Sequence, residues 1–420
     1  MSSSSSPAPT PSAKGVRAFC RAFDSINHGA LWSWLHHIGV SSKIIYIVKF
    51  LYEHASLQVR SEGKLSAETE ITEGVRQGES LRPLLFILFI NDIDLYLRGK
   101  GHYDPSIDSN NDLLTLLFAD DLLILTGSQI HLHHILHDLE DYSNSKYLKV
   151  NVSKTKTNVV FRRAGLISRI QGFPLERAGE SVETVSSYTY LGIPFSTAAL
   201  GWLPAKSAIK KAKVAVGSVL GLLSRATSDS WYATLNLFDS IVVSTLLYAA
   251  PAWALQYIED IELIQSNFYK RLLLLPSNTP SYVLRREVGS TRLGYLVVKL
   301  ILRWYIKVLK MEDHRLPKVC LCRLMDLAVP VLSQGALGDV QRHTINYNPV
   351  LQLARVLTAT NIDFNCTSKD FVYWESEEVR VLLSLKEFYL DADIAACNAS
   401  SFCQMNLPCT RQLEPAAASF

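Results

Sequence analysis

The segment Phe118-Ala119-Asp120-Asp121 places two adjacent carboxylates between the apolar runs 113–117 and 122–126. Each run has the length and composition of a β-strand, and an uncompensated charge inside a buried strand is costly. The two acids are therefore expected at the turn of a β-hairpin, where either solvent or a divalent cation neutralises them. A plain surface hairpin and a metal-binding hairpin both satisfy this pattern, so the neighbouring segments have to distinguish between them.

The composition is that of a folded chain with room for two to three domains. The chain has 420 residues, of which 48% are hydrophobic, and its formal net charge is only +3. Because this charge is small, nucleic-acid contacts would have to come from local basic patches rather than from a global field. The seven cysteines are scattered and follow no signal peptide, which indicates a reducing compartment.

Two segments have an unusual composition. Residues 1–14 are rich in serine and proline, which predicts a disordered leader. Residues 241–258 carry no charge and resemble a membrane span, but they contain Pro251 and lack flanking Lys or Arg clusters. We therefore favour a buried helix followed by a proline-broken turn, and a membrane protein built on this segment is the alternative.

Strand and helix patterns alternate irregularly up to about residue 196, which is typical of an α+β domain. The pattern predicts a hairpin over 57–71, a buried helix over 84–90, an amphipathic helix over 129–145 and a short strand over 188–195 interrupted by Gly192. Beyond residue 196 nearly every segment has helical periodicity. One of these helices places Lys206, Lys210 and Lys213 together on a face opposite an apolar stripe.

Four further motifs accompany the Asp-Asp pair in a fixed order. They are Arg-Ala-Phe-Asp-Ser-Ile-Asn-His at 21–28, Gly-Val-Arg-Gln-Gly-Glu-Ser-Leu-Arg-Pro at 74–83, Leu-Lys-Val-Asn-Val-Ser-Lys-Thr-Lys at 148–156 and Tyr-Leu-Gly-Ile at 190–193. Together the five motifs resemble the palm of reverse transcriptases of the non-LTR (LINE-like) retrotransposon family. The resemblance covers roughly residues 16–290 and is weaker after residue 246.

This resemblance implies a fold and a function. The expected fold is a right-hand polymerase palm with partial fingers over 15–196, then a helical thumb or connection over 197–330 and a helical C-terminal region over 331–420. The implied function is RNA-templated DNA synthesis, with an RNA template, a DNA primer and deoxynucleoside triphosphates as partners. No obligate protein partner and no membrane are expected, and the implied location is the cytoplasm and nucleus.

The resemblance also assigns roles around the metal site. Polymerase chemistry uses two Mg²⁺ ions about 4 Å apart, bridged by carboxylates from two strands. Asp120 and Asp121 would be catalytic metal ligands, and Lys154 would stand near the leaving pyrophosphate as an acid or charge stabiliser.

Other residues would contact the substrates. Phe23 would be the aromatic gate that rejects a 2′-hydroxyl, and Gln77 and Gly78 would line the nucleotide pocket. The lysine face formed by Lys206, Lys210 and Lys213 could contact the phosphates of a template–primer duplex. Taken alone, each of these residues also fits an ordinary structural role, as a core aromatic, a loop residue or a solvated lysine.

The chain departs from the family in two ways. The second bridging carboxylate should lie six residues before Asp24, and that position is Ala18. Asp24 itself should point away from the site, because it is one strand position past Phe23. In addition, only the low-complexity leader precedes the first motif, where the family has its fingers. Either an N-terminal truncation or a gene model with a wrong first exon is therefore expected. The sequence therefore predicts impaired synthesis, and the alternative is an inactive remnant that at most binds nucleic acid.

Two other groups of residues could bind a metal. His133 and His137 have the i, i+4 spacing of a zinc pair on a helix, but no third ligand is evident in the sequence. Cys397, Cys403 and Cys409 are spaced too widely for a zinc knuckle, although they could be the remnant of a cysteine-rich tail. A solvated helix face and unpaired cysteines are the simpler interpretations.

Overall fold

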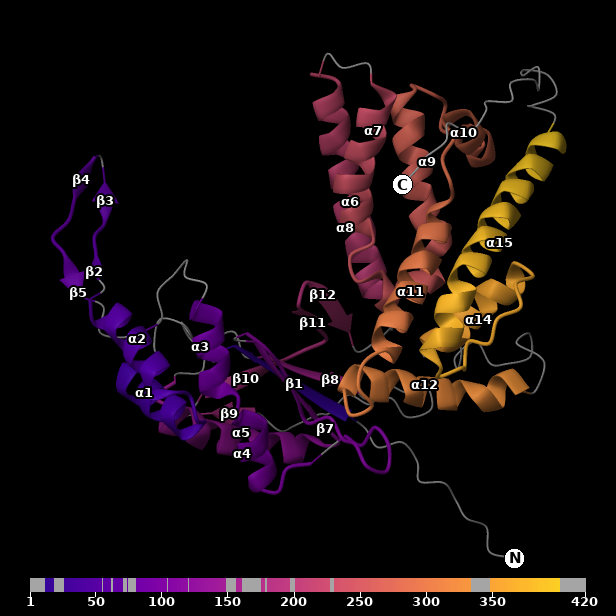
Figure 1. Cartoon of the computed structure of the whole chain (residues 1–420). Coiled ribbons are helices and arrows are strands. Elements are labelled where there is room, and N and C mark those ends of the chain that lie inside the picture. The colour runs from indigo at the N-terminus through magenta and orange to yellow at the C-terminus, as the bar shows by residue number, and fades with distance from the viewer. Residues whose placement is uncertain are drawn as a thin grey trace, which may run out of the picture. The chain divides into compact units, whose positions relative to one another are not determined.

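The structure is a computed structural model. It describes residues 12–18, 26–54, 56–61, 63–70, 74, 81–103, 105–119, 121–148, 156–160, 175–177, 180–196, 201–226, 230–333 and 348–400. The chain divides into two compact units, Met1–Ala198 and Ala199–Phe420. Unit 1 combines strands and helices, whereas the regular elements in the described part of unit 2 are all helical (Figure 1). The first unit thus has the α+β character that the sequence predicts.

A six-stranded sheet forms the centre of unit 1. Its strands are β1 (Ser12–Ala18), β6 (Thr115–Phe118), β7 (Asp121–Thr126), β8 (Lys156–Val160), β9 (Leu175–Arg177) and β10 (Glu180–Val185). They are arranged in the order β6-β7-β1-β8-β10-β9. Strand β1 lies between β7 and β8 and is antiparallel to both, while β10 runs parallel to β8. Because β1 begins at Ser12, the last three residues of the predicted leader 1–14 belong to this sheet.

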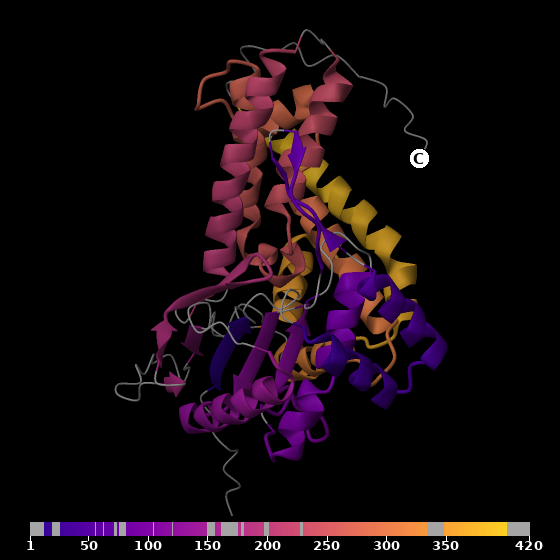
Figure 2. The same cartoon turned by 90° about the vertical axis from the view of Figure 1, so that its left-hand side faces the viewer.

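Helices of unit 1 pack against the sheet and against one another. They are α1 (His28–His37), α2 (Ser42–Glu53), α3 (Leu81–Ile90), α4 (Ile93–Gly99) and α5 (Gln129–Ser145). Helix α5 contacts β1 and β7 (Figure 1 and Figure 2), and it buries Leu132, Ile135 and Leu139 on one face. The predicted helices over 84–90 and 129–145 are therefore confirmed.

A largely buried lysine ties three of these helices together. Lys146, the C-cap of α5, places its Nζ 3.2 Å from the ring centroid of Trp34 in α1 and 3.2 Å from Asp92 Oδ2. Asp92 precedes α4 and also accepts a hydrogen bond of 2.7 Å from the Tyr142 hydroxyl. Burial lowers the pKa of Lys146, and the charge of Asp92 opposes this shift. The ion pair therefore compensates a charge that the surrounding core disfavours.

A long β-hairpin arm projects from unit 1 beyond α2 (Figure 1). It consists of β2 (Ser56–Leu57) paired with β5 (Thr69–Glu70) and β3 (Arg60–Ser61) paired with β4 (Lys64–Leu65). Gly63 adopts a positive φ of 81° at its tip, a conformation that glycine tolerates without steric cost. The predicted hairpin over 57–71 is thus confirmed.

The prediction of one interrupted strand over 188–195 is wrong. The structure has a hairpin there, formed by β11 (Ser187–Tyr190) and β12 (Ile193–Ser196). Leu191 and Gly192 form its two-residue turn, with φ angles of 49° and 77°. Two positive φ angles match the twist of antiparallel strands, although leucine at such an angle costs about 1–2 kcal/mol. Glycine at 192 therefore closes a turn rather than interrupting a strand.

Unit 2 is a helical assembly around its own hydrophobic core. Its longer helices are α6 (Trp202–Leu223), α7 (Trp231–Leu237), α9 (Ile258–Leu272), α10 (Ser281–Val288), α11 (Leu293–Leu309), α12 (Leu316–Ser333), α14 (Pro349–Ala359) and α15 (Phe371–Asn398). Helix α9 contacts both α6 and α11, and α15 lies along α11 (Figure 1). Ile301, Leu302 and Tyr305 of α11 are among the buried residues of this core.

The apolar segment 241–258 is a broken series of short helices. It spans the π-helix η1 (Phe238–Val243), α8 (Ser244–Leu246), and the 3₁₀-helices η2 (Ala250–Ala252) and η3 (Ala254–Tyr257). Pro251 lies at the start of η2, and Trp253 and Ala254 are buried. Within the described ranges, no helix has both the length and the apolarity to cross a membrane. The predicted buried helix with a proline-broken turn is confirmed.

Candidate active site

The Asp-Asp motif lies at the β6–β7 hairpin of the central sheet. Phe118, the last residue of β6, pairs with Asp121, the first residue of β7. Ala119 follows Phe118 with a positive φ of 51°, which is an uncommon angle for a residue with a Cβ. Asp120 lies outside the described residues. The predicted position of Asp121 at a hairpin between two apolar strands is therefore observed.

The neighbouring strand brings Ala18 directly opposite Asp121. Strands β1 and β7 are antiparallel, and their register runs from Ala13 opposite Thr126 to Ala18 opposite Asp121. In antiparallel sheets, directly opposite residues carry Cβ atoms about 4.5–5.5 Å apart on the same face. The position expected to carry the second bridging carboxylate is thus adjacent to Asp121.

Two tyrosines of β11 lie within electrostatic range of Asp121. Burial raises the pKa of Tyr188, and the charge of Asp121 raises it further. The pKa of Tyr190 is raised by the same two causes and additionally by Tyr188. The sequence motif at 190–193 includes Tyr190 but not Tyr188, and the alternation of residues 188 and 190 along one strand face could have revealed the second tyrosine.

The structure also joins the first two sequence motifs. The Gly74 amide donates a hydrogen bond of 2.9 Å to the Ile26 carbonyl, and the His28 Nε2 lies 2.7 Å from the Gly74 carbonyl oxygen. Ile26 and His28 end the first motif, and Gly74 begins the second. Segments separated by 46 residues are therefore held side by side in unit 1.

Comparison with known proteins identifies the domain. Residues 19–195 match the family described as "Reverse transcriptase (RNA-dependent DNA polymerase)". The chain is 26% identical over 326 residues to the Retrovirus-related Pol polyprotein from type-2 retrotransposable element R2DM of Drosophila melanogaster. The aligned region covers 76% of this chain and 28% of that protein. It is 22% identical over 277 residues to the RNA-directed DNA polymerase from mobile element jockey of Drosophila melanogaster. This alignment covers 64% of this chain and 28% of that protein.

Residues 19–195 form a reverse transcriptase domain, and the chain is similar to the polymerases of non-LTR retrotransposons. It spans only 28% of the length of these two relatives. Among solved structures, apo telomerase from Candida Tropicalis is similar, with a TM-score of 0.36 and 12% identity over 82% of this chain and 53% of that chain.

Several residues predicted to act in the reverse transcriptase domain lie outside the described residues. They are Phe23, Gln77, Gly78, Asp120 and Lys154. Their roles in nucleotide binding, metal binding and catalysis therefore stay predictions. Of the metal-binding pair, only Asp121 is placed by the structure.

The three predicted lysines of unit 2 lie exposed on helix α6. These lysines lie on the exposed side of the helix, whereas Ala205 and Ala212 belong to its buried stripe. The Lys206 Nζ lies 5.7 Å from the ring centroid of Trp202, within cation–π range. The predicted lysine face is therefore present, and its contact with nucleic acid stays a prediction.

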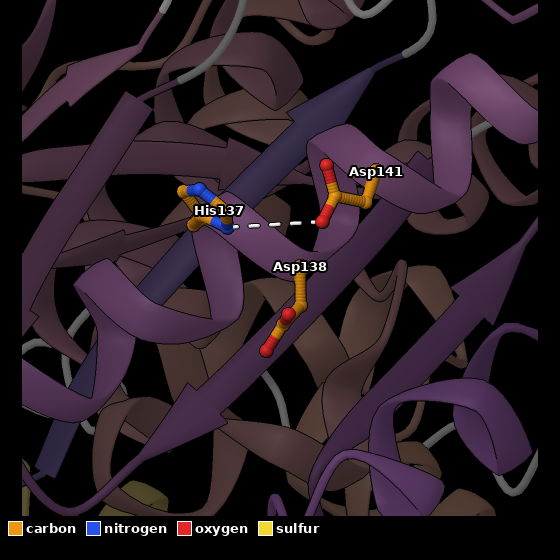
Figure 3. Close-up of side chains that lie close together, drawn as sticks. All are labelled: His137, Asp138 and Asp141. Carbon is orange, nitrogen blue, oxygen red and sulfur yellow. Dashed lines mark ion pairs between the residues drawn. The ribbon is translucent and has the colours of Figure 1, made fainter.

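The possible metal ligands on helix α5 are not the His133 and His137 pair that the sequence suggested. Within the described part of the chain, the group that could hold a metal ion joins His137 to Asp138 and Asp141, without His133. His137 Nδ1 lies 3.9 Å from Asp141 Oδ2, and one carboxylate oxygen of Asp138 lies within 4.8 Å of the ligand atoms of both residues (Figure 3). Asp138 Oδ2 also lies 2.6 Å from His102 Nε2. Asp121 is not a member of this cluster, and we assign the cluster no role.

Proposed function

We propose that the reverse transcriptase domain descends from an RNA-templated DNA polymerase and performs this synthesis only at a strongly reduced rate. The observation that carries the proposal is the pairing of Ala18 with Asp121. An antiparallel register that places residue 18 beside the Asp-Asp hairpin is the geometry by which two strands can share metal ions. A methyl group supplies no ligand at that position.

The proposal assigns polymerase subdomains to the two units. Unit 1 would be the palm, with its sheet carrying the Asp121 hairpin and with partial fingers. Helix α6 and the helices that follow it would be the thumb and connection, and the last helices would form the C-terminal region. The family match over residues 19–195 supports the first assignment. The remaining assignments rest on the order of the elements along the chain.

The residues of β1 and β7 do not complete a two-metal site. When bound, two Mg²⁺ ions activate the primer hydroxyl and neutralise the triphosphate, and they need oxygen ligands from both strands. Asp121 supplies a carboxylate from β7, and Asp120 would add a second from the same hairpin. Ala18 supplies none from β1. The negative charge available to two dications is therefore reduced, which is the physical reason for the proposed loss of rate.

The remaining predicted residues would act on the substrates. Phe23 would exclude a 2′-hydroxyl, Gln77 and Gly78 would line the deoxynucleotide pocket, and Lys154 would stabilise the leaving pyrophosphate. The lysines of α6 would contact the phosphates of the RNA template and DNA primer. We place this activity in the cytoplasm and nucleus.

A second candidate function is a non-catalytic nucleic-acid-binding remnant. The same substitution at position 18 favours it, and the exposed lysine face of α6 would supply the binding. A template–primer extension assay with the chain and with Ala18→Asp distinguishes the two functions. Extension that Ala18→Asp strengthens supports an impaired polymerase, whereas binding without extension by either protein supports the remnant.

A further inference from the structure

Unit 2 contains a strongly cationic cavity that no proposed polymerase role uses. Its volume is about 290 Å³, and it lies where the α10–α11 connection meets helix α15. Four cationic side chains line it, namely Arg285, Arg286, Arg292 and Lys386, against a single lining carboxylate, Asp393. An excess of positive charge around a concave surface indicates an anionic ligand.

The carboxylate holds part of the cavity wall in place. Arg285 donates two hydrogen bonds of 2.7 Å to Asp393, from Nε to Oδ2 and from Nη2 to Oδ1. Arg292 Nη2 also donates to Asp393 Oδ1. Burial alone would raise the pKa of Asp393, but these hydrogen bonds hold it below its usual value. One ionised carboxylate thus fixes two guanidinium groups and leaves the wall with a net positive charge.

Arg292 is oriented by a second contact and keeps an unused donor. Its guanidinium carbon lies 5.1 Å from the ring centroid of Tyr389 on α15. Its Nε is buried and has no hydrogen-bond partner among the described residues. A buried charged donor without a partner is costly, so the Arg292 Nε adds to the uncompensated positive charge beside the cavity.

The backbone amides at the N-terminus of helix α11 are not the groups that would attract an anion to the cavity. Its Gly294 amide already donates a hydrogen bond of 2.7 Å to Glu262 Oε1. Burial raises the pKa of Glu262, while Arg285 and Arg292 lower it in part. Glu262 therefore occupies the helix terminus, and side chains provide the positive field of the cavity.

We propose that this cavity binds a phosphate group of a single-stranded nucleic acid. Guanidinium and ammonium groups are the usual protein partners of phosphate, and Arg286 and Lys386 stand exposed at the cavity to receive it. Tyr295 lines the same cavity and adds an aromatic side chain, the residue type on which nucleic-acid bases stack. The choice of nucleic acid as the source of the phosphate rests on the proposed function, whereas the anion site itself does not.

The test compares two double variants, each of which removes one arginine charge and one lysine charge. Arg286→Gln with Lys386→Gln alters exposed residues of the cavity, and Lys307→Gln with Arg355→Gln alters exposed residues of unit 2 outside it. Binding of a fluorescent single-stranded oligonucleotide to the full chain is measured by anisotropy between 0.05 and 0.2 M salt, without Mg²⁺ or nucleotides. Inorganic phosphate and a deoxynucleoside triphosphate are the competing ligands.

The cavity variant should bind the oligonucleotide roughly tenfold more weakly at about 0.1 M salt, and the slope of log affinity against log salt should become shallower by about 0.7, because the contact with one phosphate is lost. Inorganic phosphate should compete with the oligonucleotide for the parent chain. Equal losses in the two double variants, or no loss in the cavity variant, would overturn the proposal. If the cavity variant weakens only triphosphate binding, the ligand is a free nucleotide and the nucleic-acid assignment is wrong. None of these results depends on DNA synthesis, so failure of the polymerase proposal is recognised separately by the extension assay.

Discussion

Ala18 and Asp121 are direct partners in the antiparallel pairing of β1 with β7. This relationship joins the third sequence motif to the residue three positions before the first motif, at one point of the central sheet. The backbone brings positions 18 and 121 beside each other, and only position 121 carries a carboxylate. If the missing carboxylate at position 18 limits DNA synthesis, one substitution at that position should restore part of the activity.

Removing the carboxylate of Asp92 should destabilise unit 1. The Lys146 Nζ, whose side chain is only 12% exposed, would lose the ion pair at 3.2 Å that compensates its burial. We expect Asp92→Asn to lower the free energy of unfolding by about 3 kcal/mol. Urea unfolding followed by circular dichroism measures the change.

The double variant Asp92→Asn with Lys146→Met serves as the control for this prediction. Because it removes the buried cation together with its partner, it should recover most of the lost stability. A double variant as unstable as the sum of the two single variants would show that the ion pair is not the source of the effect.

Asp393→Asn should destabilise unit 2 through the paired arginines. Arg285 and Asp393 have side chains only 9% and 7% exposed, and the substitution leaves a buried guanidinium without its anion. We expect a loss of about 3–5 kcal/mol, seen as faster hydrogen exchange in peptides from α10 and α15. Glu375→Gln, which breaks the exposed pair with Lys310, should cost less than about 1 kcal/mol. Similar exchange rates in the two variants would contradict this account.

The pairing of Arg285 with Asp393 predicts that the free energy of unfolding of unit 2 falls at acidic pH. The pKa of Asp393 is lower in the folded chain than in the unfolded chain. Its contribution is therefore complete above the unfolded value of about 3.9, and it is lost as the pH falls through the lower folded value. Unfolding measured between about pH 5 and pH 2 should show a steeper decline for the parent chain than for Asp393→Asn. Parallel curves would contradict the prediction.

Asp121→Asn should lower the pKa values of Tyr188 and Tyr190. Both values are raised first by burial and then by the charge of Asp121. The neutral amide removes only the second cause, so both tyrosines should still titrate above their ordinary range. Alkaline titration of ¹³Cζ-labelled tyrosine by NMR, with Tyr188→Phe to assign the signal, measures the shift. Unchanged values would place the tyrosines out of range of Asp121.

Neutralising the lysine face of α6 should weaken binding of a template–primer duplex. Replacing Lys206, Lys210 and Lys213 by glutamine removes three exposed charges from one helix face. If each contacts one phosphate, the slope of log affinity against log salt should become shallower by about 2.7. Electrophoretic mobility shift at several salt concentrations measures this slope. A slope that does not change would assign the face to solvent.

Local patterns predicted the elements that depend on neighbouring residues. Helix α5 begins and ends where its periodicity predicts. At its start, the Ser128 hydroxyl caps the helix by accepting a hydrogen bond from the His131 amide. The β6–β7 hairpin follows from two charges between two apolar runs. Both signals are contained within a short window of sequence.

Contacts between distant segments could not be predicted in this way. Arg285 and Asp393 are 108 residues apart, and no local pattern pairs them. The turn at Leu191 was missed because leucine rarely adopts a positive φ, so the sequence favoured a continuous strand. The family resemblance predicted which residue types should surround Asp121, but only the register of β1 showed that position 18 lies directly opposite it.

The most direct test of the central claim is Mg²⁺-dependent extension of a DNA primer on an RNA template by the chain and by Ala18→Asp. Ala18→Asn is the matched control, because it has nearly the same size but carries no charge. We expect Ala18→Asp to extend the primer about a hundredfold faster than the parent chain, which corresponds to about 2.7 kcal/mol, and Ala18→Asn to show no such gain. Robust Mg²⁺-dependent synthesis by the unmodified chain, or an equal gain in both variants, would contradict the account.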